Sequence, residues 1–147
     1  GLHESDQVEF ITDIAPDLPN MIGDGIRIRQ IMINLASNAF KFTDAGHVRL
    51  TAFQHDGHFH FEVEDTGMGI KPEDYDAVFN PFQQTESGRL KGKGTGLGMS
   101  ISKNLAESLG GKLWFESVYG EGTTFYLQLP LNTESDHIML ANQNNNR

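Results

Sequence analysis

The clearest pattern in the sequence is a helical repeat of hydrophobic residues between Ile26 and Thr43. At about 100° per residue, one face of this segment carries only apolar side chains: Ile28, Ile31, Leu35, Ala39 and Phe42. Four more apolar residues widen that surface: Met32, Ile33, Ala36 and Phe40. The polar residues gather in the remaining arc, which contains no acid: Arg27, Gln30, Asn34, Ser37, Asn38 and Lys41. The segment is predicted to be one amphipathic helix, with Asp24 as its N-cap.

Alternating apolar residues predict about five strands. The first runs from Val8 to Ile14 and ends at Pro16. A second and a third, His47–Phe53 and His58–Asp65, flank Asp56-Gly57, a dipeptide typical of two-residue hairpin turns. The last two, Leu113–Val118 and Thr123–Leu129, flank the turn at residues 119–122.

Two further helices are predicted. A short one has Pro72, Glu73 and Asp74 in its first turn and ends at Asn80-Pro81. A longer one, Leu97–Leu109, stops at Gly110-Gly111, and we expect its buried stripe to be Leu97, Ile101, Leu105 and Leu109. The intervening residues 83–96 have many glycines and little apolar content, which predicts a long loop of the kind that is either functional or disordered.

The predicted order of elements is β-α-β-β-α-β-β, which is not the strict alternation of a doubly wound nucleotide-binding fold. It favours an α/β fold, a two-layer sandwich in which a mixed sheet of about five strands packs on three helices. We expect residues 1–131 to form one domain. Residues 132–147 are polar and rich in asparagine, and are predicted to be a disordered tail or linker.

Composition narrows the classes of function. The 147 residues contain no cysteine, so no disulfide or thiolate metal site is possible within them, and a reducing compartment is favoured. No apolar run approaches the roughly 20 residues that span a bilayer, so a cytoplasmic domain without direct membrane contact is expected. The net charge of −9 argues against binding to nucleic acid. Positive charge is nevertheless concentrated at Arg89, Lys91 and Lys93.

The polar arc of the first helix offers candidate chemistry. Asn34 and Asn38 are four residues apart and Lys41 follows, so two amide oxygens and a cation share one face. This set suits a hard divalent metal that is also held by phosphate oxygens. A solvated or amide-bonded helix face explains the same residues equally well, and the helix alone leaves both interpretations open.

Two glycine-containing stretches bear on that choice. Residues 92–98, Gly-Lys-Gly-Thr-Gly-Leu-Gly, precede a predicted helix and lie beside three bases, a combination that favours phosphate binding. They lack the Gly-Lys-Ser/Thr ending of the nucleotide P-loop. Asp65-Thr-Gly67-Met-Gly69 follows a strand directly, and a carboxylate there can accept a hydrogen bond from an exocyclic amine such as that of adenine.

The histidines of the third strand suggest another site. His58 and His60 alternate with Phe59 and Phe61 and lie beside Glu62 and Glu64, a set that resembles metal ligands. A solvated strand face accounts for the alternation better than a metal site does.

Five motifs in order resemble the catalytic ATP-binding domain of sensor histidine kinases, within the superfamily shared with gyrase, the heat-shock chaperone ATPase and MutL. Residues 34–43, Asn-Leu-Ala-Ser-Asn-Ala-Phe-Lys-Phe-Thr, resemble the N box, and residues 65–69 resemble the G1 box. Residues 79–82, Phe-Asn-Pro-Phe, resemble the F box, residues 94–98 the G2 box, and residues 120–123, Gly-Glu-Gly-Thr, the last glycine turn. The resemblance extends from about Val8 to Leu131.

This resemblance implies that ATP binds between the first helix and a flexible lid. Asn38 would ligate Mg²⁺, with Asn34 near the metal and phosphates and Lys41 at the phosphates. Asp65 would hydrogen-bond the adenine amine with support from Thr123. The other nucleotide contacts would come from the glycine boxes and the lid, which Phe79 and Phe82 would anchor unless they are simply core aromatics: Gly67, Gly69, Arg89, Lys91, Lys93, Gly94, Thr95, Gly96, Leu97 and Gly98.

One departure separates the possible activities. In the hydrolysing members of the superfamily a glutamate stands one turn before the metal asparagine and activates water, whereas this chain has Asn34. The resemblance therefore implies a protein-histidine kinase that donates the γ-phosphoryl group of Mg-ATP in two-component signalling. Two alternatives are an ATPase of the gyrase, MutL or chaperone type, whose nucleotide drives dimerisation, and a degenerate nucleotide-sensing module. The intact Asn38, Asp65 and glycines argue against the latter.

The resemblance also implies partners. None of the six histidines lies in a phosphoacceptor motif, so the acceptor histidine is expected on a separate helical dimerisation domain. A response regulator or receiver domain would act downstream. The parent protein is expected to be longer than this chain, and an inner-membrane sensor is one possibility.

Overall fold

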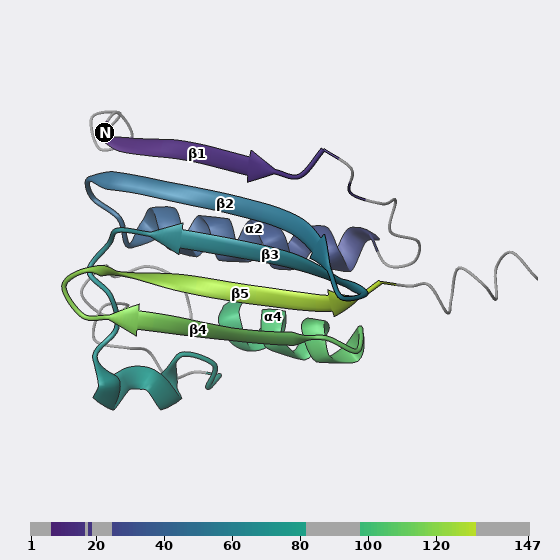
Figure 1. The fold of residues 1–147 in the computed structure, drawn as a ribbon. Coiled ribbons are helices and arrows are strands. Elements are labelled where there is room, and N and C mark those ends of the chain that lie inside the picture. Colours follow the sequence, from purple (N-terminus) through teal and green to yellow (C-terminus); the bar gives the residue numbers. More distant parts are fainter. Residues whose placement is uncertain (1–6, 17, 19–24, 82–97, 132–147) are drawn as a thin grey trace, which may run out of the picture.

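A computed structural model of the chain describes residues 7–16, 18, 25–81 and 98–131. They form a five-stranded sheet with the strand order β1-β2-β3-β5-β4. Two α-helices cover one face of this sheet, and the opposite face is open (Figure 1). The strands are β1 (Val8–Ile14), β2 (Gly46–His55), β3 (His58–Asp65), β4 (Lys112–Val118) and β5 (Gly122–Pro130), and the helices are α2 (Gly25–Lys41), α4 (Gly98–Ser108) and the 3₁₀ helix η1 (Pro72–Ala77).

The sheet is mixed, as predicted. β1 pairs with β2 in parallel, and the other three pairings are antiparallel. The turn between β2 and β3 is the predicted Asp56-Gly57 turn, in which both residues have positive φ, 54° and 74°. This is the backbone of a type I′ hairpin turn, which Asp-Gly sequences favour because their strain there is small.

Strict alternation on β3 and β5 divides the two faces of the sheet. Phe59, Phe61 and Val63 of β3 are buried beneath the helices, as are Phe125, Leu127 and Leu129 of β5. The intervening residues of β3, including both histidines, lie on the open face and are half-buried. His60 stacks on Phe53 with ring centroids 4.8 Å apart, and among the described residues no group of three histidines or carboxylates is arranged to hold a metal.

Helix α2 packs on the sheet through Ile31, Leu35 and Ala39, which belong to the predicted apolar face. It ends at Lys41, two residues before the predicted end at Thr43. Thr43 lies beyond the helix: its amide donates to the carbonyl of Phe40 at 3.4 Å, and its buried hydroxyl donates to the carbonyl of Ala39 at 2.7 Å. Phe40 points away from the sheet centre and contacts Phe10 of β1, with ring centroids 5.4 Å apart.

The predicted buried stripe of α4 was wrong in its central residue. Ile101 is 41% exposed, whereas Ser102 and Ala106 have no exposed surface. Leu105 and Leu109 do pack against the core, and Leu97 lies outside the described residues. Small side chains let α4 approach both the sheet and α2 closely. Because α4 packs on two sides, its buried face is centred on Ser102 and Ala106 and not on the more hydrophobic Ile101.

The ends of the helical layer follow their sequence signals. The amide of Gly111 donates to Ala106 at 2.8 Å and that of Gly110, with φ 82°, donates to Glu107 at 3.0 Å. These two bonds form a Schellman cap, which confirms the predicted stop of α4. The expected third helix is the 3₁₀ helix η1, and it lies near one end of the sheet instead of in the helical layer (Figure 1). None of the described helices is long and apolar enough to cross a membrane.

Candidate functional site

The carboxyl end of β3 places a row of polar side chains across three strands. Asp65 pairs in register with Thr123 of β5, and Thr123 pairs with Ser117 of β4. All three positions have the parity that faces the helical layer, and Asp65 and Thr123 are only 6% exposed. This row exists because β5 lies between β3 and β4, which brings residues nearly 60 positions apart into direct contact.

Asp65 is held by backbone donors. The N–H of Gly67 donates to its Oδ1 at 2.9 Å, and the backbone amide of Thr123 also hydrogen-bonds the carboxylate. Burial nevertheless raises the pKa of Asp65 to about 6, because the carboxylate has lost more hydration than these bonds return. A carboxylate in this state is a strong acceptor that lacks a full set of donors, and it would gain from another N–H group.

The glycines after Asp65 are required by close backbone approach. A Cβ on Gly67 would overlap the carbonyl of Phe42, just past the end of α2. A Cβ on Gly69, where φ is 75°, would overlap the backbone of Val118 and Tyr119. The Asp65–Gly69 turn is therefore wedged between α2 and the β4–β5 turn, and this contact brings the predicted N box and G1 box together.

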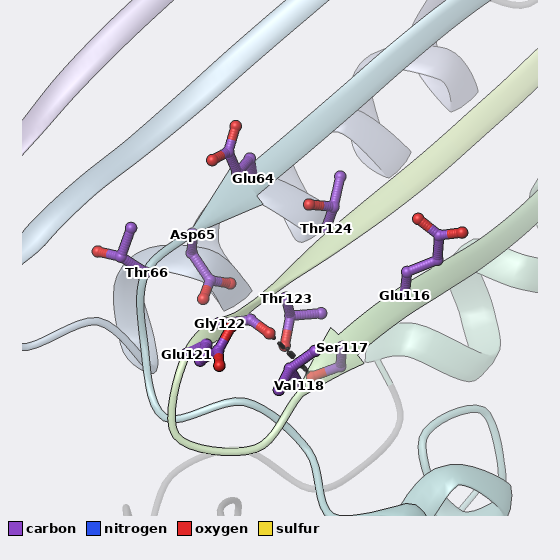
Figure 2. A pocket seen from close by; sticks show the side chains of 10 residues that line it. All are labelled: Glu64, Asp65, Thr66, Glu116, Ser117, Val118, Glu121, Gly122, Thr123 and Thr124. Atoms are coloured by element: carbon purple, nitrogen blue, oxygen red, sulfur yellow. Dashed lines mark hydrogen bonds between the residues drawn. The ribbon is translucent and has the colours of Figure 1, made fainter.

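Ser117 was not among the predicted site residues. Its Oγ accepts the amide of Ile70 at 2.8 Å, contacts the Thr123 hydroxyl at 2.8 Å and lies 3.0 Å from the carbonyl of Gly122 (Figure 2). It joins the G1 turn to β5. The sequence did contain a signal for this position. Ser117 alternates with Leu113 and Phe115 along β4, so the three side chains lie on the same, inward face of the strand.

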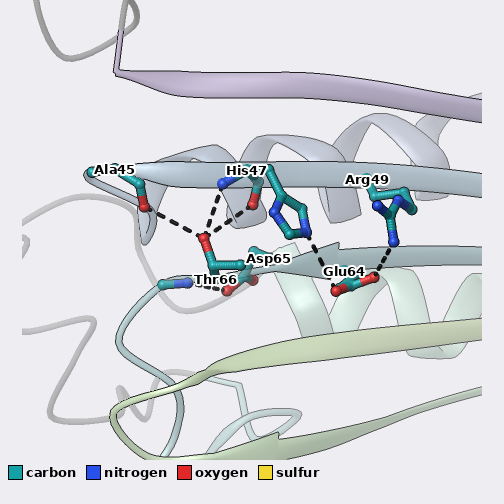
Figure 3. A network of polar contacts seen from close by, with 7 residues as sticks. Ala45, His47, Arg49, Glu64, Asp65 and Thr66 are labelled. Carbon is teal, nitrogen blue, oxygen red and sulfur yellow. Dashed lines mark hydrogen bonds and ion pairs between the residues drawn. The ribbon is translucent and has the colours of Figure 1, made fainter.

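Thr66 was also missed, and it ties the same turn to β2. Its Oγ1 accepts the amide of His47 at 2.9 Å and lies within 3.4 Å of the carbonyls of Ala45 and His47 (Figure 3). Next to it, Glu64 contacts the ring of His47 at 3.3 Å and the guanidinium of Arg49 at 3.4 Å. The G1 turn is thus anchored to β2, β4 and β5.

A shallow depression of about 270 Å³ lies at this end of the sheet and is lined in part by the row itself (Figure 2). Four carboxylates line it, those of Glu64, Asp65, Glu116 and Glu121. Negative charge of this density would repel a triphosphate. Phosphate groups are therefore expected on the helical side, where α2 presents its amides.

The polar arc of α2 is only partly solvated. Asn34 and Asn38 are half-buried, and the Nδ2 group of Asn34 donates to Ser102 Oγ of α4 at 3.0 Å. The sequence left open a metal–phosphate site and a solvated or amide-bonded helix face. For the amide nitrogen of Asn34, the hydrogen bond to Ser102 agrees with the second interpretation. Lys41 is half-buried, with its Nζ 5.0 Å from the centroid of the Phe42 ring.

The remaining predicted residues divide into described and undescribed ones. Phe79 packs in the aromatic cluster, 5.8 Å from Phe115 and 6.2 Å from Phe125, with Lys103 Nζ 4.9 Å from its ring centroid. It is therefore a core aromatic, and a further role as lid anchor stays a prediction. Gly98 is the exposed first residue of α4. The others lie outside the described residues: Phe82, Arg89, Lys91, Lys93, Gly94, Thr95, Gly96 and Leu97.

Comparison with known proteins identifies the family. Residues 23–133 match the family described as histidine kinase-, DNA gyrase B- and HSP90-like ATPase. Histidine protein kinase 1 of Candida albicans is 42% identical over 132 residues, which cover 85% of this chain and 5% of that protein. The ArcB homolog of Haemophilus influenzae, an aerobic respiration control sensor protein, is 43% identical over 102 residues, 69% of this chain and 31% of that protein.

Solved structures agree. The full-length ShkA structure in complex with AMPPNP matches 86% of this chain and 26% of that one, with a TM-score of 0.74 and 35% identity. The catalytic domain of the histidine kinase ThkA matches 86% of this chain and 82% of that one, with a TM-score of 0.73 and 28% identity. The chain spans less than a third of the length of the curated relatives named above. It belongs to the family of histidine kinase-, DNA gyrase B- and HSP90-like ATPases, and it is a catalytic ATP-binding domain of the histidine kinase type.

Proposed function

We propose that this domain binds Mg-ATP and donates the γ-phosphoryl group to a histidine on a separate helical phosphoacceptor domain. The observation that carries the proposal is the buried carboxylate of Asp65, whose turn packs against the end of α2, the helix that bears Asn34 and Asn38. Gly67 occupies one carboxylate oxygen of Asp65, and the adenine amine would donate to this under-solvated group. Thr123 and Ser117 hold the strand ends that surround it.

The phosphate end of the site would be formed by α2 and by residues 89–98. Asn38 would ligate Mg²⁺, with Asn34 beside it and Lys41 on the phosphates. Amide oxygens on a half-buried face fit a hard cation that is shared with phosphate oxygens. The bound metal would neutralise charge on the phosphoryl group during in-line transfer. Arg89, Lys91 and Lys93 would add positive charge, and the glycines from Gly94 to Gly98 would supply backbone donors.

Position 34 favours transfer over hydrolysis. Its side chain is an amide with no useful basicity, and its nitrogen is already bonded to Ser102. Water would therefore lack the carboxylate that activates it in hydrolysing members of the superfamily, whereas an acceptor imidazole is itself a nucleophile. The proposed partners are this acceptor domain and a response regulator or receiver domain. Because ATP is the donor, we place the reaction in the cytoplasm.

A phosphotransfer assay tests the proposal. The 147-residue chain is mixed with ATP labelled at the γ-phosphate, Mg²⁺ and the phosphoacceptor domain of the parent protein. The expected product is phosphate on that domain that acid removes and base does not, as for phosphohistidine. Rapid hydrolysis of ATP by the chain without an acceptor, and no labelled acceptor, would instead support the ATPase alternative.

A further inference from the structure

Ser102 is a buried polar residue whose position the hydrophobic pattern did not anticipate. Its exposed fraction is 0%, and it lies on the first turns of α4, shortly after the glycine-rich residues 92–98. Buried hydroxyl groups need a hydrogen-bond partner, because burial without one costs free energy. The partner is Asn34 of α2, 68 positions away in the sequence, at 3.0 Å.

The direction of this bond defines the orientation of the amide. Nδ2 of Asn34 donates to Ser102 Oγ, so the Oδ1 atom lies at the opposite end of the planar amide group. Asn38 is one helical turn further along the same face of α2. If the amide turned over, Oδ1 would face Ser102 and the hydroxyl would have to donate to it. In the structure the hydroxyl accepts from Nδ2, so Oδ1 is the end of the amide that faces away from Ser102.

We infer that Ser102 is a positioning residue, which holds Asn34 with Oδ1 facing the Mg²⁺–phosphate group of bound ATP. The inference rests on the proposed function. An oxygen in that place attracts the cation or its bound water, whereas an NH₂ group would repel it. Ser102 thereby lets the Asn34 amide present an oxygen atom at the position where hydrolysing relatives have a carboxylate. It also links α2 to the beginning of α4, the two helices that flank the proposed phosphate site.

Replacement of Ser102 by alanine should affect the metal end of the site alone. Alanine removes one oxygen from a buried position and is the best helix former, so the variant is expected to fold. Affinity for AMPPNP with Mg²⁺ should fall about fivefold to tenfold, the value of one directed hydrogen bond. Affinity for AMPPNP in EDTA should not change, because Asp65 is untouched. Ser108→Ala is the matched control, since that serine is exposed on the same helix and its hydroxyl donates to the backbone carbonyl of Leu105.

Calorimetry of the 147-residue wild type and of both variants, with Mg²⁺ and in EDTA, gives these affinities, and nitrogen-15 NMR gives a readout that needs no nucleotide. The side-chain NH₂ resonances of Asn34 should be protected from exchange in the wild type and in Ser108→Ala, and unprotected in Ser102→Ala. Addition of Ser102→Ala to Asn34→Ala should weaken Mg-AMPPNP binding no further, because Ser102 acts through Asn34.

The outcomes are separable. Equal Mg-AMPPNP affinities for Ser102→Ala and Ser108→Ala would overturn the inference while the proposed function stands. An equal loss with and without Mg²⁺, or an additive loss in the double variant, would also overturn it, since either marks a merely structural role. Failure of the wild-type chain to bind Mg-AMPPNP would overturn both the inference and the proposed function.

Discussion

Asp65 and Asn34 lie at two ends of one candidate site, but the fold holds them by different means. Asp65 is 6% exposed and is fixed by backbone amides in a turn that three strands clamp. Asn34 is half-buried on a helix surface, where its amide nitrogen donates a hydrogen bond to the side chain of Ser102. The first end is preorganised by the backbone and the second by side chains. We therefore expect base recognition to tolerate few changes, and metal and phosphate binding to depend on individual side chains.

The largest effect is expected at the side-chain end. Asn38→Asp places a negative charge beside the phosphates in place of a neutral ligand, and should abolish Mg-ATP-dependent transfer to the acceptor domain. Labelled-phosphate transfer measures this, and circular dichroism checks the fold. Gln30→Glu adds the same charge two turns earlier on α2 and serves as the control. Unchanged transfer by Asn38→Asp would remove the metal assignment.

At the backbone end, Asp65→Asn should weaken ATP binding by at least about a hundredfold, because its NH₂ group would face the adenine amine or the donors that now hold the carboxylate. The apo fold should not suffer, since a neutral amide is cheaper to bury than a carboxylate. Calorimetry with Mg-AMPPNP and urea unfolding measure the two effects. If affinity is retained, adenine does not bind at Asp65.

Gly67→Ala tests whether the turn itself is the rigid element. The new methyl group would overlap the Phe42 carbonyl, so the turn or the end of α2 must move, at a cost of about 1–3 kcal/mol in the free energy of unfolding. Gly25→Ala is the matched control because nothing lies within 4 Å of its Cβ position. Urea denaturation of both variants measures the difference. Equal stability of the two would show that the turn is not wedged against α2.

A change of pH should act on the backbone end alone. The pKa of Asp65 is raised to about 6 from 3.8, so the folded state binds a proton more tightly than the unfolded state. Stability should therefore fall as pH rises from about 3 to about 7, by about 3 kcal/mol in total, and Asp65→Asn should lack this dependence. ATP affinity should change the other way, because protonation removes the acceptor. Relative to Asp65→Asn, it should fall about tenfold from pH 7 to pH 5.

Local sequence signals were reliable where backbone chemistry and short-range packing decide the structure. The Asp56-Gly57 hairpin, the Gly110-Gly111 cap and the alternation of β3 all follow from residues that are neighbours in the chain. The rotation of α4 does not. Ile101 outranks Ser102 in hydrophobicity, but α4 packs against both the sheet and α2, and Ser102 is the side chain small enough for that approach and able to bond Asn34.

The sequence by itself determined the elements, the order of the motifs and the absence of a carboxylate at position 34, because these depend on residue identity and local spacing. Only the tertiary structure decided which residues meet. The insertion of β5 between β3 and β4 aligned Asp65, Thr123 and Ser117, and the packing of α4 on α2 joined Ser102 to Asn34. Strand order and helix rotation are set by how the whole core fills space, which no single stretch of sequence encodes.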